Sequence, residues 1–336
     1  MLKIFKFKKI KTYFCLFFIF FNRLILKKKQ IIDNFNINHF KSSILKYPKL
    51  IDIKLNYSDK CGKYFRFKQN NERDLILFAY NSINSEYYSE RSLLIYNIID
   101  SIKKNIPNVK IVCFVQNSNI DLIIQILRKN NVLIIKRKKF LNMKLVSSRF
   151  LYEYEFLKKN INYYDRVIHA DLTDIVFLSD IFKTLKSNEL IMNKECGINS
   201  YLGKNGTLIL NDTSNREWLL TSFGNNKTLL KILEKINPVV INAGLIMGDS
   251  KEYLKFLDIM IKNFNYIKAS NYGYDQILLN VLYYTGELNK INIKLDLCTQ
   301  RSCLLPNLIF NTKNKELYYN NTGCSPILIH KSYPSN

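Results

Sequence analysis

Between residues 74 and 170 the sequence alternates between short apolar runs and longer segments whose apolar residues recur at helical spacing. The apolar runs are residues 75–80, 109–115, 132–135 and 166–170, and the segments of helical periodicity are residues 87–105, 119–130 and 147–159. This alternation is typical of β-α-β units, in which consecutive strands lie parallel and helices cover the sheet. We therefore expect an α/β fold with a mainly parallel central sheet flanked by helices.

The residues after the first expected strand exclude two common classes of nucleotide-binding site. Tyr80-Asn-Ser-Ile-Asn84 contains neither GxGxxG nor GxxxxGK. Those glycine-rich loops are needed where the backbone approaches a phosphate closely. The sequence therefore argues against a dinucleotide-binding dehydrogenase and against a P-loop protein.

The second half of the chain continues with strands and helices after a less regular segment. Residues 183–238 are irregular and contain Trp218, the only tryptophan. The later expected elements are a strand at 239–247, a helix capped by Asp249-Ser-Lys-Glu252, a helix at 275–285, and a strand at 327–329 followed by His330. The chain thus has enough regular structure for one large domain.

The formal net charge is +24, which first suggests a nucleic-acid partner. The lysines are mostly scattered, and alanine is scarce while Lys, Asn, Ile, Tyr and Phe are abundant. This bias is typical of AT-rich coding sequence and needs no nucleic-acid partner. No aromatic-interleaved basic motif of an RNA- or DNA-binding module occurs. We expect no nucleic-acid partner, with a basic, non-enzymatic nucleic-acid-binding protein as the alternative.

The N-terminus has the pattern of a membrane anchor. Five lysines precede an apolar run at residues 13–26, which as a helix is about 21 Å long and so short of a hydrocarbon core of about 30 Å. No small-residue cleavage site follows it. We interpret residues 1–11 as a cytosolic basic tail, 12–26 as a signal anchor, 27–70 as a stem or linker, and 71–336 as the catalytic domain. A single-pass type II protein of the Golgi or ER membrane is expected, with secretion after signal cleavage as the alternative.

Six cysteines follow the apolar run, an even number that suits a lumenal protein with disulfides. None of them forms a CxxC pair or a Cys/His zinc spacing. Cys113 lies inside an expected buried strand, which favours a thiol in the core.

Two carboxylates, Asp171 and Asp174, directly follow the expected strand at residues 166–170. In open α/β sheets, ligands bind outside the carboxyl ends of parallel strands. Two carboxylates there can share one hard divalent cation, which can in turn hold a diphosphate. The alternative is an ordinary polar turn in which Asp180 caps a short helix and the pair is merely solvated.

Four motifs occur in order along the chain. They are Asp171/Asp174, Asn242-Ala-Gly244, Tyr272-Gly-Tyr-Asp-Gln-Ile-Leu-Leu-Asn280, and His330 after the last strand. Over roughly residues 74–333 this order resembles the GT-A nucleotide-diphospho-sugar transferases, including family-8-type glycosyltransferases and those with a D-x-R-D-x-x-F-Q-x-D-P-F strand end. The chain departs from that pattern at Thr173, which replaces Arg, and at Asp180-Ile-Phe182, which replaces D-P-F.

The resemblance implies a GT-A-type fold and a metal-dependent glycosyltransferase with a nucleotide-sugar donor, UDP-linked, transferring to a glycan, protein or lipid acceptor, with retention of configuration. It implies Mn²⁺ or Mg²⁺ held by Asp171, Asp174 and His330, catalytic roles for Asp275 and Gln276, and donor or substrate contacts from Asp171, Asn242, Ala243, Gly244 and Arg149. One imidazole among oxygen ligands favours Mn²⁺.

Each of these residues also has an ordinary structural interpretation. A single histidine is more often structural than a ligand, and Gly244 can be an ordinary glycine at a strand bend. Asp275 can cap a helix, and a helix arginine such as Arg149 is usually solvated. The structure must therefore decide which of them meet.

Overall fold

The computed structural model describes residues 53–81, 88–116, 122–140, 142–195, 206–297, 299–304, 308–311, 313–319 and 322–330. The expected basic tail, signal anchor and first part of the stem lie outside these residues. Among the helices that are described, none is both long and apolar enough to span a membrane.

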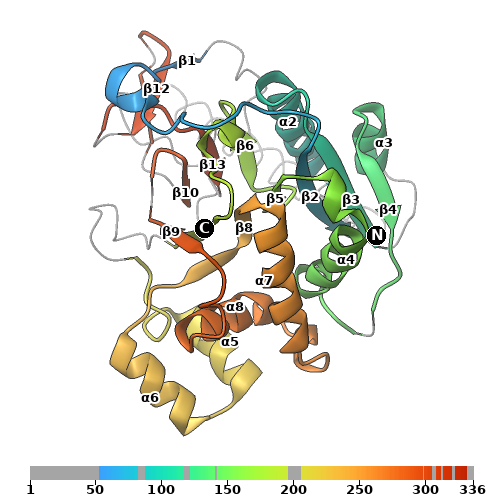
Figure 1. Ribbon diagram of the computed structural model, residues 1–336, viewed down its shortest axis with the longest axis vertical. Coiled ribbons are helices and arrows are strands. Elements are labelled where there is room, and N and C mark those ends of the chain that lie inside the picture. Colours follow the sequence, from blue (N-terminus) through green and yellow to red (C-terminus); the bar gives the residue numbers. More distant parts are fainter. Residues whose placement is uncertain are drawn as a thin grey trace, which may run out of the picture.

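A seven-stranded sheet forms the centre of the molecule (Figure 1). Its order is β4 (Leu133–Lys136), β3 (Lys110–Gln116), β2 (Asp74–Asn81), β5 (Arg166–Ala170), β8 (Ile241–Asp249), β7 (Leu190–Lys194) and β9 (Ile293–Asp296). Four of the six neighbouring pairs are parallel, since only β8 runs antiparallel to its neighbours β5 and β7. The predicted α/β fold with a mainly parallel central sheet is confirmed.

Helices cover both faces of the sheet. They are α2 (Tyr88–Asn105), α3 (Leu122–Lys129), α4 (Leu145–Asn160), α5 (Thr213–Phe223), α6 (Lys227–Ile236), α7 (Ser250–Lys262) and α8 (Tyr274–Tyr284), with short 3-10 helices η3 (Asp59–Gly62), η4 (Ile161–Tyr163), η5 (Ile181–Thr184) and η7 (Lys268–Ser270). Between its polar end residues, strand β2 is apolar because alternate residues face two cores. Ile76 and Phe78 pack with α2 and α3 residues, and Leu75 and Leu77 pack with α4, α7 and α8 residues.

Two small three-stranded sheets lie beside the central one. The first contains β1 (Lys54–Leu55), β12 (Glu316–Tyr319) and β11 (Leu308–Asn311), and the second contains β10 (Ser302–Leu304), β13 (Leu328–His330) and β6 (Ile175–Phe177). Strand β6 follows the Asp171–Asp174 turn, and β13 is antiparallel to it. Residues 328–330 are therefore held beside the predicted site.

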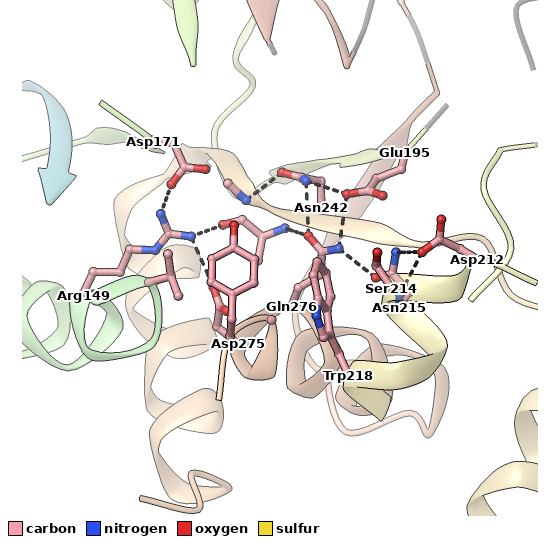
Figure 2. Close-up of a pocket in the computed structure, with 15 residues that line it drawn as sticks. Arg149, Asp171, Glu195, Asp212, Ser214, Asn215, Trp218, Asn242, Asp275 and Gln276 are labelled. Atoms are coloured by element: carbon pink, nitrogen blue, oxygen red, sulfur yellow. Dashed lines mark hydrogen bonds and ion pairs between the residues drawn. The ribbon is translucent and has the colours of Figure 1, made fainter. Parts of the chain in front are cut away.

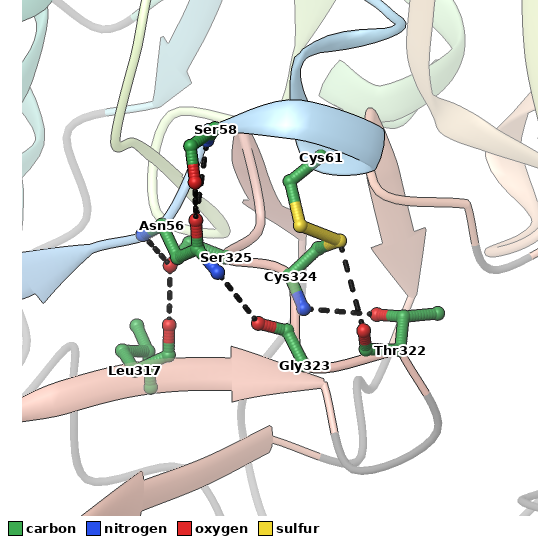
Figure 3. The surroundings of a disulfide bond; sticks show 8 residues. All are labelled: Asn56, Ser58, Cys61, Leu317, Thr322, Gly323, Cys324 and Ser325. Carbon is green, nitrogen blue, oxygen red and sulfur yellow. Dashed lines mark hydrogen bonds between the residues drawn. A yellow bond between two sulfur atoms is a disulfide. The ribbon is translucent and has the colours of Figure 1, made fainter.

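Residues 53–70, which the sequence pattern assigns to the stem, are attached to the C-terminal segment. Strand β1 pairs with β12, and a disulfide joins Cys61 to Cys324, 263 positions apart (Figure 3). The hydroxyl of Ser325 accepts a hydrogen bond from the backbone of Asn56 at 2.6 Å. Cys113 is a fully buried thiol in β3, as expected.

The amino-terminal edge of the central sheet is closed by Arg166, the first residue of β5. Its guanidinium donates to both carboxylate oxygens of Asp74, the first residue of β2, at 2.7 and 2.6 Å. Three further bonds go to the carbonyls of Lys68, Gln69 and Phe182 at 2.7–2.9 Å. Because Asp74 is fully buried, this bidentate pair lies inside the fold and links the segment before β2 to the region after β6.

Candidate active site

The candidate site lies at the opposite, carboxyl edge of the central sheet. Asp171 directly follows β5, and Glu195 directly follows β7. Strand β8 runs the other way, so its first residues lie at this same edge, where Asn242 is opposite Asn193 and Leu245 is opposite Ala170. This is the edge at which ligands bind in open α/β sheets.

A cavity of about 260 Å³ opens at this edge (Figure 2). Seven of the sequence-predicted site residues line it, namely Arg149, Asp171, Asn242, Ala243, Gly244, Asp275 and Gln276. They come from α4, the β5 end, β8 and the start of α8, which are far apart in the sequence. The fold therefore brings together the motifs that the sequence presents separately.

Gly273 determines how α8 enters the site. It is the N-cap of α8 at φ +79°, a conformation that favours glycine. A Cβ at this position would lie 2.1 Å from the Cδ2 atom of Trp218, so the indole packs directly against the glycine. Asp275 is the second residue of α8 and does not cap it, because the N-cap position belongs to Gly273. Asp275 and Gln276 are both buried and line the cavity.

Arg149 is the centre of an ion-pair network on one wall of the cavity. Its Nη1 donates to the Asp171 carboxylate, and its Nη2 donates to the carbonyl of Ala243 at 3.1 Å and to Asp275 at 3.3 Å. Only 5% of the Arg149 side chain is exposed, against 26% for Asp171. This arginine is thus not solvated, and two carboxylates share it.

The pKa values of this network follow from burial and charge. Burial alone would lower the pKa of Arg149, but the carboxylates of Asp171, Asp275 and Glu153 outweigh it and raise that pKa. Burial raises the pKa of Asp275 above its ordinary value of 3.8. The attraction of Arg149 opposes this shift, but the repulsion from the nearby Asp171 weakens that opposition. Asp275 therefore holds a proton more tightly than an exposed aspartate.

A second network links amide and carboxylate groups on another wall. Glu195 Oε1 accepts from Asn242 Nδ2 at 2.7 Å and from Gln276 Nε2 at 3.2 Å. Gln276 Nε2 also donates to Asn215 Oδ1 at 2.9 Å, and its Oε1 accepts from the Ala243 backbone at 3.3 Å. Asn215 in turn donates twice to Asp212 Oδ1, at 2.8 and 2.9 Å. These bonds fix the orientation of every amide in the wall.

Gly244 is required by the Asp171 side chain. A Cβ on Gly244 would lie 2.4 Å from Asp171 Oδ2 and 2.9 Å from Asn242 Oδ1. The backbone of Asp171 also donates to the carbonyl of Gly244 at 3.0 Å. The glycine therefore lets the Asp171 carboxylate lie flat against β8, rather than serving only as a strand bend.

His169 contacts the cavity wall through the carbonyl of Ala243. It is fully buried, its Nδ1 contacts Glu153 at 2.8 Å, and its Nε2 contacts the carbonyl of Ala243 at 3.0 Å. A carbonyl only accepts, so Nε2 carries a proton. Together with Arg149, His169 fixes the Ala243 peptide at the cavity wall.

Asp174 and His330 lie near the cavity but do not line it. The backbone of Asp174 donates to the carbonyl of Asp171 at 3.2 Å, which places both carboxylates on one turn. Thr173 donates to Asp174 Oδ1 at 2.9 Å. His330 is fully buried in β13 opposite Ile175, the residue after Asp174. In the part of the chain that the structure describes, no group of three or more His, Cys, Asp or Glu side chains is arranged to hold a metal ion.

Asp180 has the structural role that the sequence allowed as an alternative. It is the N-cap of η5 and accepts from the backbone of Phe182 at 3.0 Å, and it also accepts from the backbone of Asn70 at 2.8 Å. The capping interpretation is therefore correct for Asp180, while Asp171 on the same stretch lines the cavity.

Several lining residues were not found from the sequence. They are Val146, Glu195, Asp212, Ser214, Asn215 and Trp218, whereas Tyr272 and Gly273, which also line the cavity, belong to the motif at residues 272–280. Glu195 follows the end of a strand, which is the same signal that identified Asp171. Most of the others come from the irregular segment 183–238, where no periodic pattern predicts a position.

Comparison of the chain with protein-family models and with curated protein sequences finds no match in either set.

Proposed function

We propose that this chain is a glycosyltransferase that moves a sugar from a nucleotide-sugar donor, UDP-linked, to a glycan, protein or lipid acceptor. The observation that carries the proposal is the convergence of Asp171, Asn242, Ala243, Gly244, Asp275 and Gln276 around one cavity at the carboxyl edge of the sheet. These residues come from three of the four motifs that resemble the GT-A transferases. The mainly parallel sheet is compatible with that fold.

The charge of the cavity supports a role for a divalent cation. Asp171, Glu195, Asp212 and Asp275 line it with Arg149 as the only described cation, and Arg149 is already paired with two of them. A sugar nucleotide's diphosphate would be repelled by these carboxylates in a partly dry site. A hard cation bound between the carboxylate oxygens of the cavity and the phosphate oxygens of the donor removes that repulsion.

The proposal assigns the cation, Mn²⁺ or Mg²⁺, to Asp171, Asp174 and His330. Two carboxylates and one imidazole are donor types that suit Mn²⁺, but in the described structure these three side chains do not form a group that could hold a metal ion, so binding would require them to be brought together. When bound, the cation would neutralise charge on the departing diphosphate.

The other cavity residues would bind and orient the sugar. In the transfer, the bond from the anomeric carbon to the diphosphate breaks, a bond to the acceptor oxygen forms, and the acceptor gives up a proton. By the resemblance, Asp275 and Gln276 face the donor sugar. Gln276 is held by three neighbours, so it can present its amide in a fixed orientation. Retention of configuration is part of the proposal only through the resemblance.

A Golgi or ER lumenal location of the catalytic domain, with anchoring through residues 12–26, also belongs to the proposal. The Cys61–Cys324 disulfide supports it, since disulfides persist in oxidising compartments. Secretion after signal cleavage is supported equally by this bond.

The test is release of nucleoside diphosphate by the full-length protein from a panel of sugar nucleotides, with Mn²⁺ and with EDTA. We expect Mn²⁺-dependent turnover of at least one donor. Asp275→Asn should reduce it by about 100-fold or more, as for loss of one group that stabilises a transition state. Glu234→Gln, an exposed change on α6 away from the cavity, should leave it unchanged.

The metal assignment has its own variants. Asp174→Asn should lower turnover by orders of magnitude without lowering the thermal midpoint, and His330→Ala should raise the Mn²⁺ concentration needed for half-maximal activity. Turnover of no donor by the unchanged protein, together with steeply salt-dependent binding to DNA or RNA, would refute the proposal and favour the nucleic-acid-binding alternative.

A further inference from the structure

One wall of the cavity is aromatic. Trp218 on α5 lines the cavity (Figure 2). Its ring lies 5.4 Å, between centroids, from that of Tyr272 before α8, with the two planes at 72°. Trp218 is held in place by contact with Gly273, and Tyr272 is 63% exposed. Rigid aromatic side chains provide apolar contact area at low cost in conformational entropy. Such a wall suits a ligand with one apolar face.

The amide and carboxylate network of the cavity has acceptors that remain available. Both hydrogen bonds to Glu195 use Oε1, and both hydrogen bonds to Asp212 use Oδ1. Within the described chain, no residue donates to Oε2 of Glu195 or to Oδ2 of Asp212. A carboxylate oxygen in this position accepts a hydrogen bond from a hydroxyl group, and such charge-assisted bonds are strong.

The charge of this wall is uncompensated. Arg149 pairs with Asp171 and Asp275, whereas Glu195 and Asp212 form no ion pair with any residue that the structure describes. A ligand that carries its own carboxylate would meet two unpaired negative charges here. Unpaired like charges are an effective way to exclude a competing ligand.

From these three features we infer that the cavity binds an uncharged sugar ring and excludes acidic sugars, an inference that rests on the proposed glycosyltransferase function. A pyranose ring has a face of C–H groups, which would lie against Trp218, and a rim of hydroxyl groups, which would donate to Glu195 and Asp212. Uronic and sialic acids keep the apolar face but add the charge that this wall repels. The ring belongs either to the donor or to the acceptor.

The single tryptophan makes the test direct, because Trp218 fluorescence reports on this cavity alone. The full-length protein with Mn²⁺ is titrated with UDP-glucose and with UDP-glucuronate, which differ only at C6. A second titration uses methyl glucoside and methyl glucuronide. In at least one pair, the neutral member should change the fluorescence at a concentration about tenfold lower or less than the acidic member needs.

The matched variant is Glu195→Gln, which removes the charge and keeps the shape. It should reduce the preference for the neutral member. Glu217→Gln is the control, because it removes one charge from an exposed position on α5 that does not line the cavity. It should leave the preference unchanged. A preference confined to the UDP-linked pair assigns the ring to the donor, and one confined to the methyl glycosides assigns it to the acceptor.

The outcomes separate this inference from the proposed function. Equal binding of both members, a preference for the acidic member, or no fluorescence change with any sugar overturns the inference, even if donor turnover is found. A preference for neutral sugars with no turnover of any donor supports the inference and counts against the glycosyltransferase proposal.

Discussion

Two buried arginines at opposite edges of the same sheet have different environments. Arg166, at the amino-terminal edge, donates five hydrogen bonds of 2.6–2.9 Å to one carboxylate and three carbonyls. Arg149, at the carboxyl edge, is shared by two carboxylates and one carbonyl, and its buried Nε has no acceptor in the described chain. The guanidinium of Arg166 thus has a full set of hydrogen-bond acceptors. The guanidinium of Arg149 lies beside a cavity, and one of its nitrogen atoms has no acceptor in the described chain.

The two environments indicate different roles for the two edges of the sheet. At the amino-terminal edge, one positive charge meets one negative charge in complete geometry, which closes the fold. At the carboxyl edge, two carboxylates share one guanidinium. Burial raises the pKa of Asp275 there, as it does for Asp74 at the other edge, but at the carboxyl edge the repulsion from Asp171 adds to the shift. A ligand can supply the hydrogen bonds and the charge that such a network lacks. Incomplete arrangements of this kind are found at functional sites.

The largest effect is expected for Arg166→Met. The substitution leaves the Asp74 carboxylate fully buried without a cation, and it removes the bonds to the segment before β2. Breaking a buried pair in this way costs about 3–5 kcal/mol. Chemical denaturation should show this loss, while the folded fraction keeps donor turnover. A loss of less than about 1 kcal/mol in the free energy of unfolding would show that the two edges do not differ in their contribution to stability.

Arg149→Met should reverse that pattern. Turnover should fall by about 100-fold, since the positions of Asp171 and Asp275 depend on this guanidinium. The stability cost should be smaller, about 1–3 kcal/mol, because Asp171 is partly exposed and Asp275 can take up a proton. Kinetics and denaturation on the same preparation measure both. Full turnover in this variant would remove Arg149 from the site.

The raised pKa of Asp275 predicts a dependence of stability on pH. The folded state binds this proton more tightly than the unfolded state, so the group's contribution to stability is complete below pH 3.8. It is lost as the pH rises through the folded pKa, with a slope of at most about 1.4 kcal/mol per pH unit. Asp275→Asn should remove this contribution from a series of denaturation curves measured across that window. An unchanged slope would place the titration elsewhere.

The smallest effect is expected at the exposed neighbour of the Arg166 pair. Arg73 and Asp165 stand next to Asp74 and Arg166 in the sequence and form an ion pair at 2.8 Å whose side chains are 52% and 55% exposed. Exposed pairs contribute little because water and salt screen them. Arg73→Ala should leave the unfolding midpoint unchanged within error. A clear shift would mean that exposure does not explain the contrast.

Much of the fold could be predicted because it follows from local patterns. The strand expected at 75–80 is β2, and the helix expected at 87–105 is α2. Asp249 is the N-cap of α7 and accepts from the backbones of Lys251 and Glu252, as the motif predicts, although the Glu252 side chain contacts Lys255. These features depend on a few neighbouring residues, so a single sequence contains them.

The cavity could be predicted only in part. Asp171 was found because it follows a strand end, and Glu195 could have been found by the same rule. Trp218 could not, because its position depends on contact with Gly273 across 55 positions of sequence. Arg149 and Glu153 can be recognised in the sequence as a buried charged pair. They are opposite charges four positions apart on the buried face of a helix. Long-range packing gives no such local signal.

The disulfide makes the described chain a covalent ring, because Cys61 and Cys324 lie close to its two ends. Every residue of the cavity, from Val146 to Gln276, lies within that ring. A single backbone cut between the two cysteines would therefore open the ring without releasing a fragment. Limited proteolysis should give one band of unchanged mass without reductant and two bands with it. The bond thus retains both parts of a nicked chain in one molecule.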